Sequence, residues 1–179
     1  MKTRHLLGTA VLAIVAATGT TVSAGEPVRD DRLTSSERRI VREAQQRYRD
    51  VESALADGYI PVSDCVADAD AGGMGFHYLN PGLAADTVVD PTAPEILVYV
   101  PHPDGSLKLG ALEWWVADDD QDLGTDSDRP SLFDRLPFDG PMPGHDPQMP
   151  VHYDLHVWLG VHNPAGQLAP FNPKVVCDD

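Results

Sequence analysis

In the last two thirds of this chain the apolar residues recur with a period of two, which predicts β-strands and restricts the fold more than any other feature. Residues 96–100 and 107–116 are rich in β-branched and aromatic residues and flank the turn 101–105, so they predict a β-hairpin. Residues 74–79 and 151–159 predict two further strands, each followed by a turn that contains Asn-Pro. The sequence does not alternate strands with helices and has no glycine-rich phosphate loop, so a doubly wound nucleotide-binding fold is not indicated.

One amphipathic helix is predicted before the strands. Thr34-Ser35-Ser36-Glu37 has the form of a capping box, and apolar residues then recur at three- and four-residue spacing until Gly58. The other face of this helix carries five Arg, which we interpret as a solvated face that pairs with nearby Asp rather than as a site for an anionic partner. The expected fold is α+β, with one N-terminal amphipathic helix packed on a mainly antiparallel β-sheet, and residues 34–179 form a single globular domain. Residues 137–150 contain five Pro and predict an extended connection.

The first 24 residues have the features of a secretory signal peptide. Lys2 and Arg4 precede an apolar run at residues 6–17, and Val22-Ser23-Ala24 is a small-residue cleavage site. The run is too short to cross a bilayer, which argues against an uncleaved anchor, and no later segment is apolar enough to span a membrane. We therefore predict cleavage after Ala24, a polar lead-in at residues 25–33, and a secreted, periplasmic or cell-envelope location.

Charge and cysteine content narrow the class of protein. The chain has 13 Lys and Arg against 28 Asp and Glu, a formal net charge of −15, which disfavours binding to nucleic acid or to an anionic membrane surface. Its two cysteines, Cys65 and Cys177, predict a disulfide in an exported chain. A lone metal-binding Cys is the less favoured alternative.

Chemistry-bearing residues are densest in the predicted strand 151–159. Alternation places five apolar residues on one face and His152, Asp154, His156 and Trp158 on the other. Residues of one face lie about 6.6 Å apart along a strand, so His152 and His156, about 13 Å apart, cannot easily share one ion. Further ligands would have to come from neighbouring strands.

Two residues of other predicted strands are candidates for the same site. His77 lies on the opposite face of its strand from Phe76 and Tyr78. Glu113 stands between Leu112 and two Trp, where a carboxylate is costly unless a cation or hydrogen bond pairs with it. Imidazole and carboxylate suit a transition metal such as Zn, Cu or Fe. The predicted metal ligands are His77, Glu113, His152, Asp154 and His156.

Several other readings of these residues carry less weight. His152-x-Asp154 matches half of the two-His-one-carboxylate iron triad, but the second His of that triad normally lies far downstream, where only His162 remains. Glu113 and Asp154 could act as an acid–base pair of the glycosidase kind, which no spacing in the sequence tests. The acidic residues 118–128 do not follow the EF-hand order and predict a solvated loop rather than a calcium site. No nucleophile elbow is present, and we expect His102 and His145 to be exposed and uninvolved.

The chain resembles a set of uncharacterised exported bacterial proteins. The blocks that carry the resemblance are Gly72-Gly-Met-Gly-Phe-His-Tyr-Leu-Asn-Pro81, Pro94-Glu-Ile-Leu-Val-Tyr99, Leu112-Glu-Trp114, His152-Tyr-Asp-Leu-His-Val-Trp158, Asn163-Pro-Ala-Gly166 and Asn172-Pro-Lys-Val-Val-Cys177. They extend over most of the chain after the predicted signal peptide. The resemblance implies export and no particular reaction.

Two functional hypotheses follow from the sequence. In the first, the polar strand face of a disulfide-stapled exported domain binds a metal or a small polar ligand, and a metal with an open coordination position would be a Lewis acid. In the second, the protein is a non-catalytic secreted or envelope-associated interaction protein, and the same residues form a structural hydrogen-bonded network. The substrate, any reaction and the oligomeric state are not indicated by the sequence.

Overall fold

The computed structural model describes residues 32–145 and 148–177. The predicted signal peptide, residues 1–24, and most of the predicted lead-in lie outside the described residues. Within the described part of the chain, no helix combines the length and the apolar character that crossing a bilayer requires.

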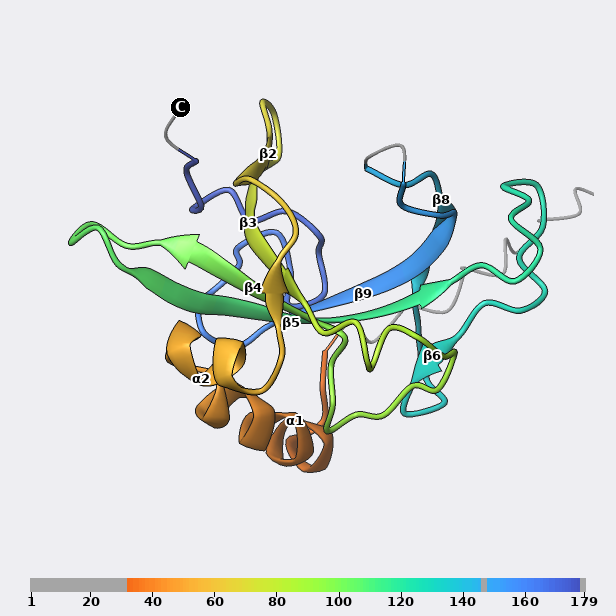
Figure 1. Cartoon of the computed structure of the whole chain (residues 1–179), viewed down its shortest axis with the longest axis horizontal. Helices are drawn as coiled ribbons and strands as arrows, with labels where there is room; N and C mark the ends of the chain where they lie inside the picture. Colours follow the sequence, from red (N-terminus) through yellow and green to blue (C-terminus); the bar gives the residue numbers. More distant parts are fainter. Residues whose placement is uncertain (1–31, 146–147, 178–179) are drawn as a thin grey trace, which may run out of the picture. The chain divides into compact units, whose positions relative to one another are not determined.

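The described chain is built around a seven-stranded sheet in which every pairing is antiparallel. The strand order is β1-β3-β4-β5-β9-β8, and β2 also pairs with β3 (Figure 1). The strands of this sheet are β1 (Ile60–Pro61), β2 (Val66–Asp68), β3 (Gly72–Leu79), β4 (Ile96–Pro101), β5 (Leu107–Ala117), β8 (Asp139–Met142) and β9 (His152–Trp158). A separate two-stranded sheet pairs β6 (Ser131–Leu132) with β7 (Leu136–Pro137). The predicted α+β class with a mainly antiparallel sheet is confirmed.

The four strands predicted from alternation are β3, β4, β5 and β9, and β4 and β5 form the predicted hairpin. The short strands were not predicted, because two to four residues give too little alternation to recognise. Among the short strands, β8 lies beside β9, the strand that carries most of the predicted site residues. It falls within the Pro-rich segment predicted as a connection, and it pairs with β9 at Asp139 with Asp154 and at Met142 with His152.

The helical segment differs from the single helix that the sequence predicts. Two helices form instead, α1 (Ser35–Arg47) and α2 (Val51–Ala56). The break occurs at Asp50, whose side chain accepts a hydrogen bond from the backbone N–H of Glu52 at 3.1 Å and so begins a second helix. The apolar period continues through the break, which is why the periodicity alone did not reveal it.

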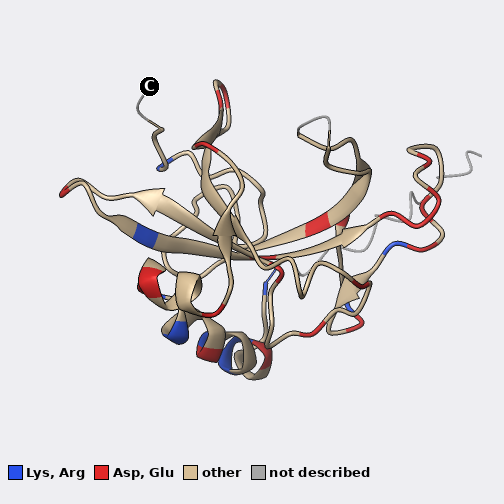
Figure 2. Cartoon of the chain, in the orientation of Figure 1, with Lys and Arg blue, Asp and Glu red and all other residues tan. Residues whose placement is uncertain are grey.

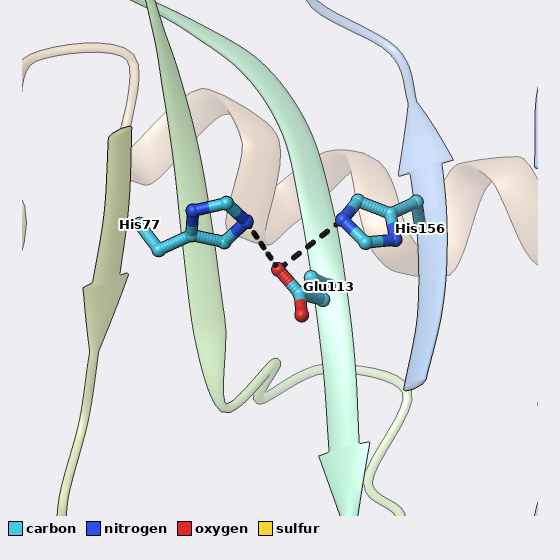
Figure 3. A group of neighbouring side chains, drawn as sticks. All are labelled: His77, Glu113 and His156. Carbon is cyan, nitrogen blue, oxygen red and sulfur yellow. Dashed lines mark ion pairs between the residues drawn. The ribbon is translucent and has the colours of Figure 1, made fainter. Parts of the chain in front are cut away.

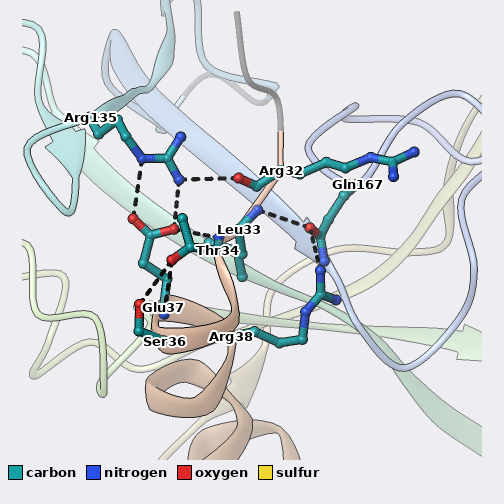
Figure 4. Close-up of polar contacts among 8 residues, drawn as sticks. All are labelled: Arg32, Leu33, Thr34, Ser36, Glu37, Arg38, Arg135 and Gln167. Carbon is teal, nitrogen blue, oxygen red and sulfur yellow. Dashed lines mark hydrogen bonds and ion pairs between the residues drawn. The ribbon is translucent and has the colours of Figure 1, made fainter.

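The start of α1 is tied to distant parts of the chain (Figure 4). Thr34 and Glu37 form the predicted capping box, and the Arg135 guanidinium donates to Glu37 Oε2 at 2.6 Å and to Oε1 at 3.2 Å. Gln167 Oε1 accepts from the backbone N–H of Leu33 at 3.1 Å and from Arg38 at 3.4 Å. These contacts connect the helix to the segments after β6 and after β9.

The two faces of the large sheet bury different sets of side chains. Both helices lie on one side of it (Figure 1), where residues such as Val41 and Ala44 pack against Leu97, Tyr99 and others of the sheet. The opposite face has a second apolar cluster made of Ile96, Val98, Val100, Ala111, Trp115, Trp158 and Val175. The predicted histidines and carboxylates lie on this second face.

The C-terminal segment covers part of the second face. Asn172 pairs with Gly73, and the close approach requires glycine, since a Cβ on Gly72 or Gly73 would collide with residues 172–175. The Cys65–Cys177 disulfide then fixes the end of this segment beside β2, with the two Cα atoms 5.6 Å apart. The predicted disulfide is therefore present.

Candidate metal centre

The sheet register brings the predicted site residues to one face. On the β5–β9 ladder Glu113 stands opposite His156, Trp115 opposite Asp154 and Ala117 opposite His152. The predicted grouping of His152, Asp154 and His156 on one face of β9 agrees with this register. All three side chains and Glu113 are at most 3% exposed, so the face is buried rather than open to solvent.

His77, Glu113 and His156, which we call the Glu113 group, converge from three strands (Figure 3). His77 Nε2 lies 3.5 Å and His156 Nε2 lies 3.4 Å from the same carboxylate oxygen, Glu113 Oε2. The two imidazole planes are nearly perpendicular, at 89°. One ligand atom from each residue lies within 4.8 Å of the other two, so a single metal ion can reach all three.

Ser63 orients the His77 ring. Its hydroxyl accepts a hydrogen bond from the backbone N–H of His77 at 3.0 Å and also lies 3.0 Å from His77 Nδ1. The contact occupies Nδ1 and leaves Nε2 as the ring atom that faces Glu113 (Figure 3). Such partners of the second ring nitrogen are the usual way in which a protein fixes a metal-binding imidazole.

Several polar atoms in this region are buried without a hydrogen bond from the described residues. They are Glu113 Oε2, Asp154 Oδ1, His152 Nε2 and both ring nitrogens of His156. Leaving a buried donor or acceptor unpaired costs about 1–3 kcal/mol per group, and more for a charged group. A positively charged group placed among these atoms would satisfy them.

Burial and charge set the protonation of the group. Burial lowers the pKa of His77 to about 3, so its ring is neutral and keeps a lone pair for a metal. Burial raises the pKa of Glu113 to about 7. For His156, burial lowers the pKa, but the carboxylates of Glu113 and Asp154 outweigh burial and raise it to about 9. A proton therefore occupies the region between these carboxylates, where a metal ion would replace it.

The other two residues of the predicted site form a separate cluster with a third histidine. His145, His152 and Asp154, which we call the Asp154 group, also place one ligand atom each within 4.8 Å of the others. The sequence predicts that His145 is exposed and uninvolved. It is exposed, but its ring lies against that of His152, with the ring centroids 5.7 Å apart. This contact was not predictable from the sequence, because the chain returns to the sheet through a Pro-rich segment with no regular period.

A cavity of about 410 Å³ adjoins the Glu113 group. His77, Glu113 and His156 contribute to its wall together with apolar side chains such as Met74, Ile96 and Met149. Small-molecule sites commonly combine an apolar wall with a few convergent polar groups. The cavity therefore gives the Glu113 group room for a small ligand beside a bound ion.

A larger cavity, of about 940 Å³, lies between α1 and the ends of β5 and β9. It is lined by Arg38, Arg42, Arg49 and Lys108. Of the helix arginines, Arg47 pairs with Asp57 at 2.6 Å as predicted, but no described carboxylate pairs with those that line this cavity. We place the functional site at the smaller cavity, because the buried unpaired ligand atoms lie there.

The acidic residues 118–128 belong to neither the Glu113 group nor the Asp154 group. Asp118 is buried, and the remaining carboxylates of this loop are exposed. Figure 2 shows Asp and Glu mainly in loops and on the helices. This agrees with the prediction of a solvated loop.

Comparison of the chain with protein-family models, curated proteins and solved structures finds no match.

Proposed function

We propose that this protein is an exported, disulfide-stapled metal-binding protein whose principal ion is held by His77, Glu113 and His156. Zn, Cu and Fe all accept imidazole and carboxylate ligands, and zinc fits this donor set best. Export is supported by the predicted signal peptide, by the resemblance to exported bacterial proteins, and by the disulfide, which is typical of an oxidising compartment.

The proposal rests mainly on one observation. Two imidazoles both point toward the same buried carboxylate oxygen. Their Nε2 atoms lie 3.5 Å and 3.4 Å from Glu113 Oε2. Two ligand atoms bound tetrahedrally to zinc, with bonds of 2.0–2.2 Å, lie about 3.3–3.6 Å apart. The two imidazole–carboxylate separations thus match the edges of a tetrahedral zinc site, and the ligand nitrogens of the two imidazoles lie within 4.8 Å of each other.

Asp154 acts on the same ion through the ring of His156. Its Oδ1 lies 3.7 Å from His156 Nδ1, the ring nitrogen that points away from Glu113. The two atoms are too far apart for a hydrogen bond, but the Asp154 charge faces Nδ1 and favours a proton there, which leaves Nε2 free for the metal. This gives a carboxylate–histidine–metal arrangement.

Three protein ligands leave a fourth tetrahedral position, as in catalytic rather than purely structural zinc sites. The adjoining cavity of about 410 Å³ offers space for a water molecule or a small polar ligand at that position. A bound ion there supplies Lewis-acid character. The protein's own residues hold the ion, exclude bulk water from the two imidazoles, and provide the apolar wall.

The alternative of a purely structural network is less favoured. A structural network would join the buried groups by hydrogen bonds, whereas His156 and Glu113 Oε2 have no hydrogen-bond partner among the described residues. The separations of 3.4–3.7 Å are long for hydrogen bonds to charged groups, which are about 2.7–2.9 Å.

Elemental analysis of untagged protein tests the proposal. We expect stoichiometric metal in the wild type, loss of the ion from the Glu113 group in His156→Ala, and a higher melting temperature when Zn²⁺ is added to the stripped wild type. Glu113→Gln preserves the shape of the side chain, so its zinc affinity should fall by more than the about 10–100-fold typical of an outer-shell change. His102→Ala, which alters an exposed histidine outside the site, is the matched control.

A stripped wild type that takes up no Zn²⁺, Cu²⁺ or Fe²⁺ and keeps an unchanged melting temperature would refute the metal and favour the structural network.

A further inference from the structure

The tautomer of His152 identifies a second ligand atom that the Glu113 group does not use. His152 Nδ1 lies 3.1 Å from the carbonyl oxygen of Pro150. A carbonyl only accepts hydrogen bonds, so Nδ1 must carry the proton. This leaves Nε2 as the ring atom available to a ligand, and it faces Asp154 Oδ2 at 3.7 Å.

This pair of atoms is fully enclosed. The His152 side chain is 0% exposed and that of Asp154 is 3% exposed. No described residue donates a hydrogen bond to His152 Nε2. A buried polar atom without a partner is unfavourable, and a metal ion between His152 Nε2 and the Asp154 carboxylate would satisfy this nitrogen. The indole of Trp115 stacks on the His152 ring at 5.8 Å with a 30° interplanar angle, which restrains the ring in this orientation.

His145 supplies the third metal-ligand atom. One ring nitrogen of His145, one of His152 and one Asp154 oxygen fall within the same 4.8 Å limit. Because His145 is exposed while the other two residues are buried, it stands on the solvent side and offers an ion a path into the group.

We infer that His145, His152 and Asp154 hold a second divalent transition-metal ion, so that the protein carries two metal positions on one face of its sheet. The inference rests on the proposed function only in taking the Glu113 group as the first position. The two groups share no ligand residue, so they are two neighbouring mononuclear positions rather than a pair of ions about 3.5–4 Å apart bridged by common ligands.

Asp154 connects the two positions. Its Oδ2 faces His152 in the second position, and its Oδ1 faces Nδ1 of His156, a ligand of the first. Occupation of the second position fixes the carboxylate that orients His156. The first ion should therefore bind more tightly when the second is present.

The test is the zinc stoichiometry of the full, untagged chain, stripped with a chelator and then equilibrated with excess free Zn²⁺. We expect two Zn²⁺ per wild-type chain, one per His152→Ala chain and one per His145→Ala chain. His145 is exposed, so its substitution keeps the test valid if His152→Ala fails to fold. The double variant His102→Ala/His162→Ala removes exposed histidines outside both groups and should retain two ions.

The outcomes separate the two proposals. One ion in the wild type that persists in His145→Ala and His152→Ala but disappears in His77→Ala overturns the second position and leaves the first intact. Two ions in the wild type and in both His145 and His152 variants also overturn it, because the second ion then lies elsewhere. No ion in the wild type refutes the proposed function as well as the inference. Cobalt substitution adds a spectroscopic measurement, since loss of one of two Co²⁺ environments in His145→Ala would support two distinct positions.

Discussion

At the scale of single residues, Glu95 is a buried carboxylate with a fixed partner. It is 2% exposed, and its Oε2 accepts a hydrogen bond from the backbone N–H of Trp115 at 3.0 Å. Burial raises its pKa to about 7 from an ordinary value of 4.5. Between these two pH values the folded protein keeps a proton that the unfolded chain has released, so stability falls as the pH rises through this interval.

Glu95→Gln should remove this pH dependence. The amide oxygen can still accept from Trp115, but no charge is buried. We expect the metal-free variant to match the wild type near pH 4.5 and to be more stable by about 1–3 kcal/mol at pH 8. Urea unfolding from pH 4.5 to 8, in the presence of a chelator, measures the difference. Parallel curves for the two proteins would show that the Glu95 carboxyl has the same pKa in the folded and unfolded chains.

At the scale of elements, α1 begins with a capping box that also takes part in a tertiary contact. Thr34 accepts from the backbone N–H of Glu37 at 3.3 Å, and Glu37 Oε2 accepts from the backbone N–H of Thr34 at 2.7 Å. The same carboxylate binds Arg135, so the cap also joins the helix to the segment that carries β6 and β7. Disrupting the cap therefore affects a tertiary contact as well as the helix.

Thr34→Ala should lower the free energy of unfolding by about 1 kcal/mol, because the backbone N–H of Glu37 loses the side-chain oxygen that accepts its hydrogen bond. Ser35→Ala, one residue further along, is the control, and it should change stability by less than about 0.5 kcal/mol. Chemical denaturation of the three proteins gives both values. An equal effect of the two substitutions would mean that the cap contributes nothing of its own.

At the scale of the whole molecule, the disulfide joins residues that are 112 positions apart. It holds the C-terminal segment over the second face, where Val175 belongs to the apolar cluster near the site. A crosslink of this span restricts the unfolded chain strongly, and in the chain-entropy view the effect grows with the logarithm of loop length.

Replacing both Cys65 and Cys177 by Ser should lower the free energy of unfolding by about 2–5 kcal/mol. The proposed metal ligands lie on β3, β5, β9 and the segment before β9, so the variant should still bind metal at temperatures where it remains folded. Thermal unfolding with and without Zn²⁺ measures both properties. A variant as stable as the wild type would show that packing of the C-terminal segment suffices without the bond.

The sequence by itself determined the local features. Alternation identified the main strands and assigned His152, Asp154 and His156 to one face of β9, because side-chain direction along a strand depends only on neighbouring positions. Two cysteines permit only one pairing within a chain, so the disulfide also followed. The burial of Glu113 was predictable from its apolar neighbours.

Only the tertiary structure decided which ligands meet. β4 lies between β3 and β5, so His77 reaches Glu113 across an intervening strand, and β9 beside β5 brings His156 to the same oxygen. Strand order and the return of His145 arise from contacts between residues distant in sequence, which a local period does not encode. For the same reason the break between α1 and α2, which depends on one capping side chain rather than on the apolar pattern, appeared only in the folded chain.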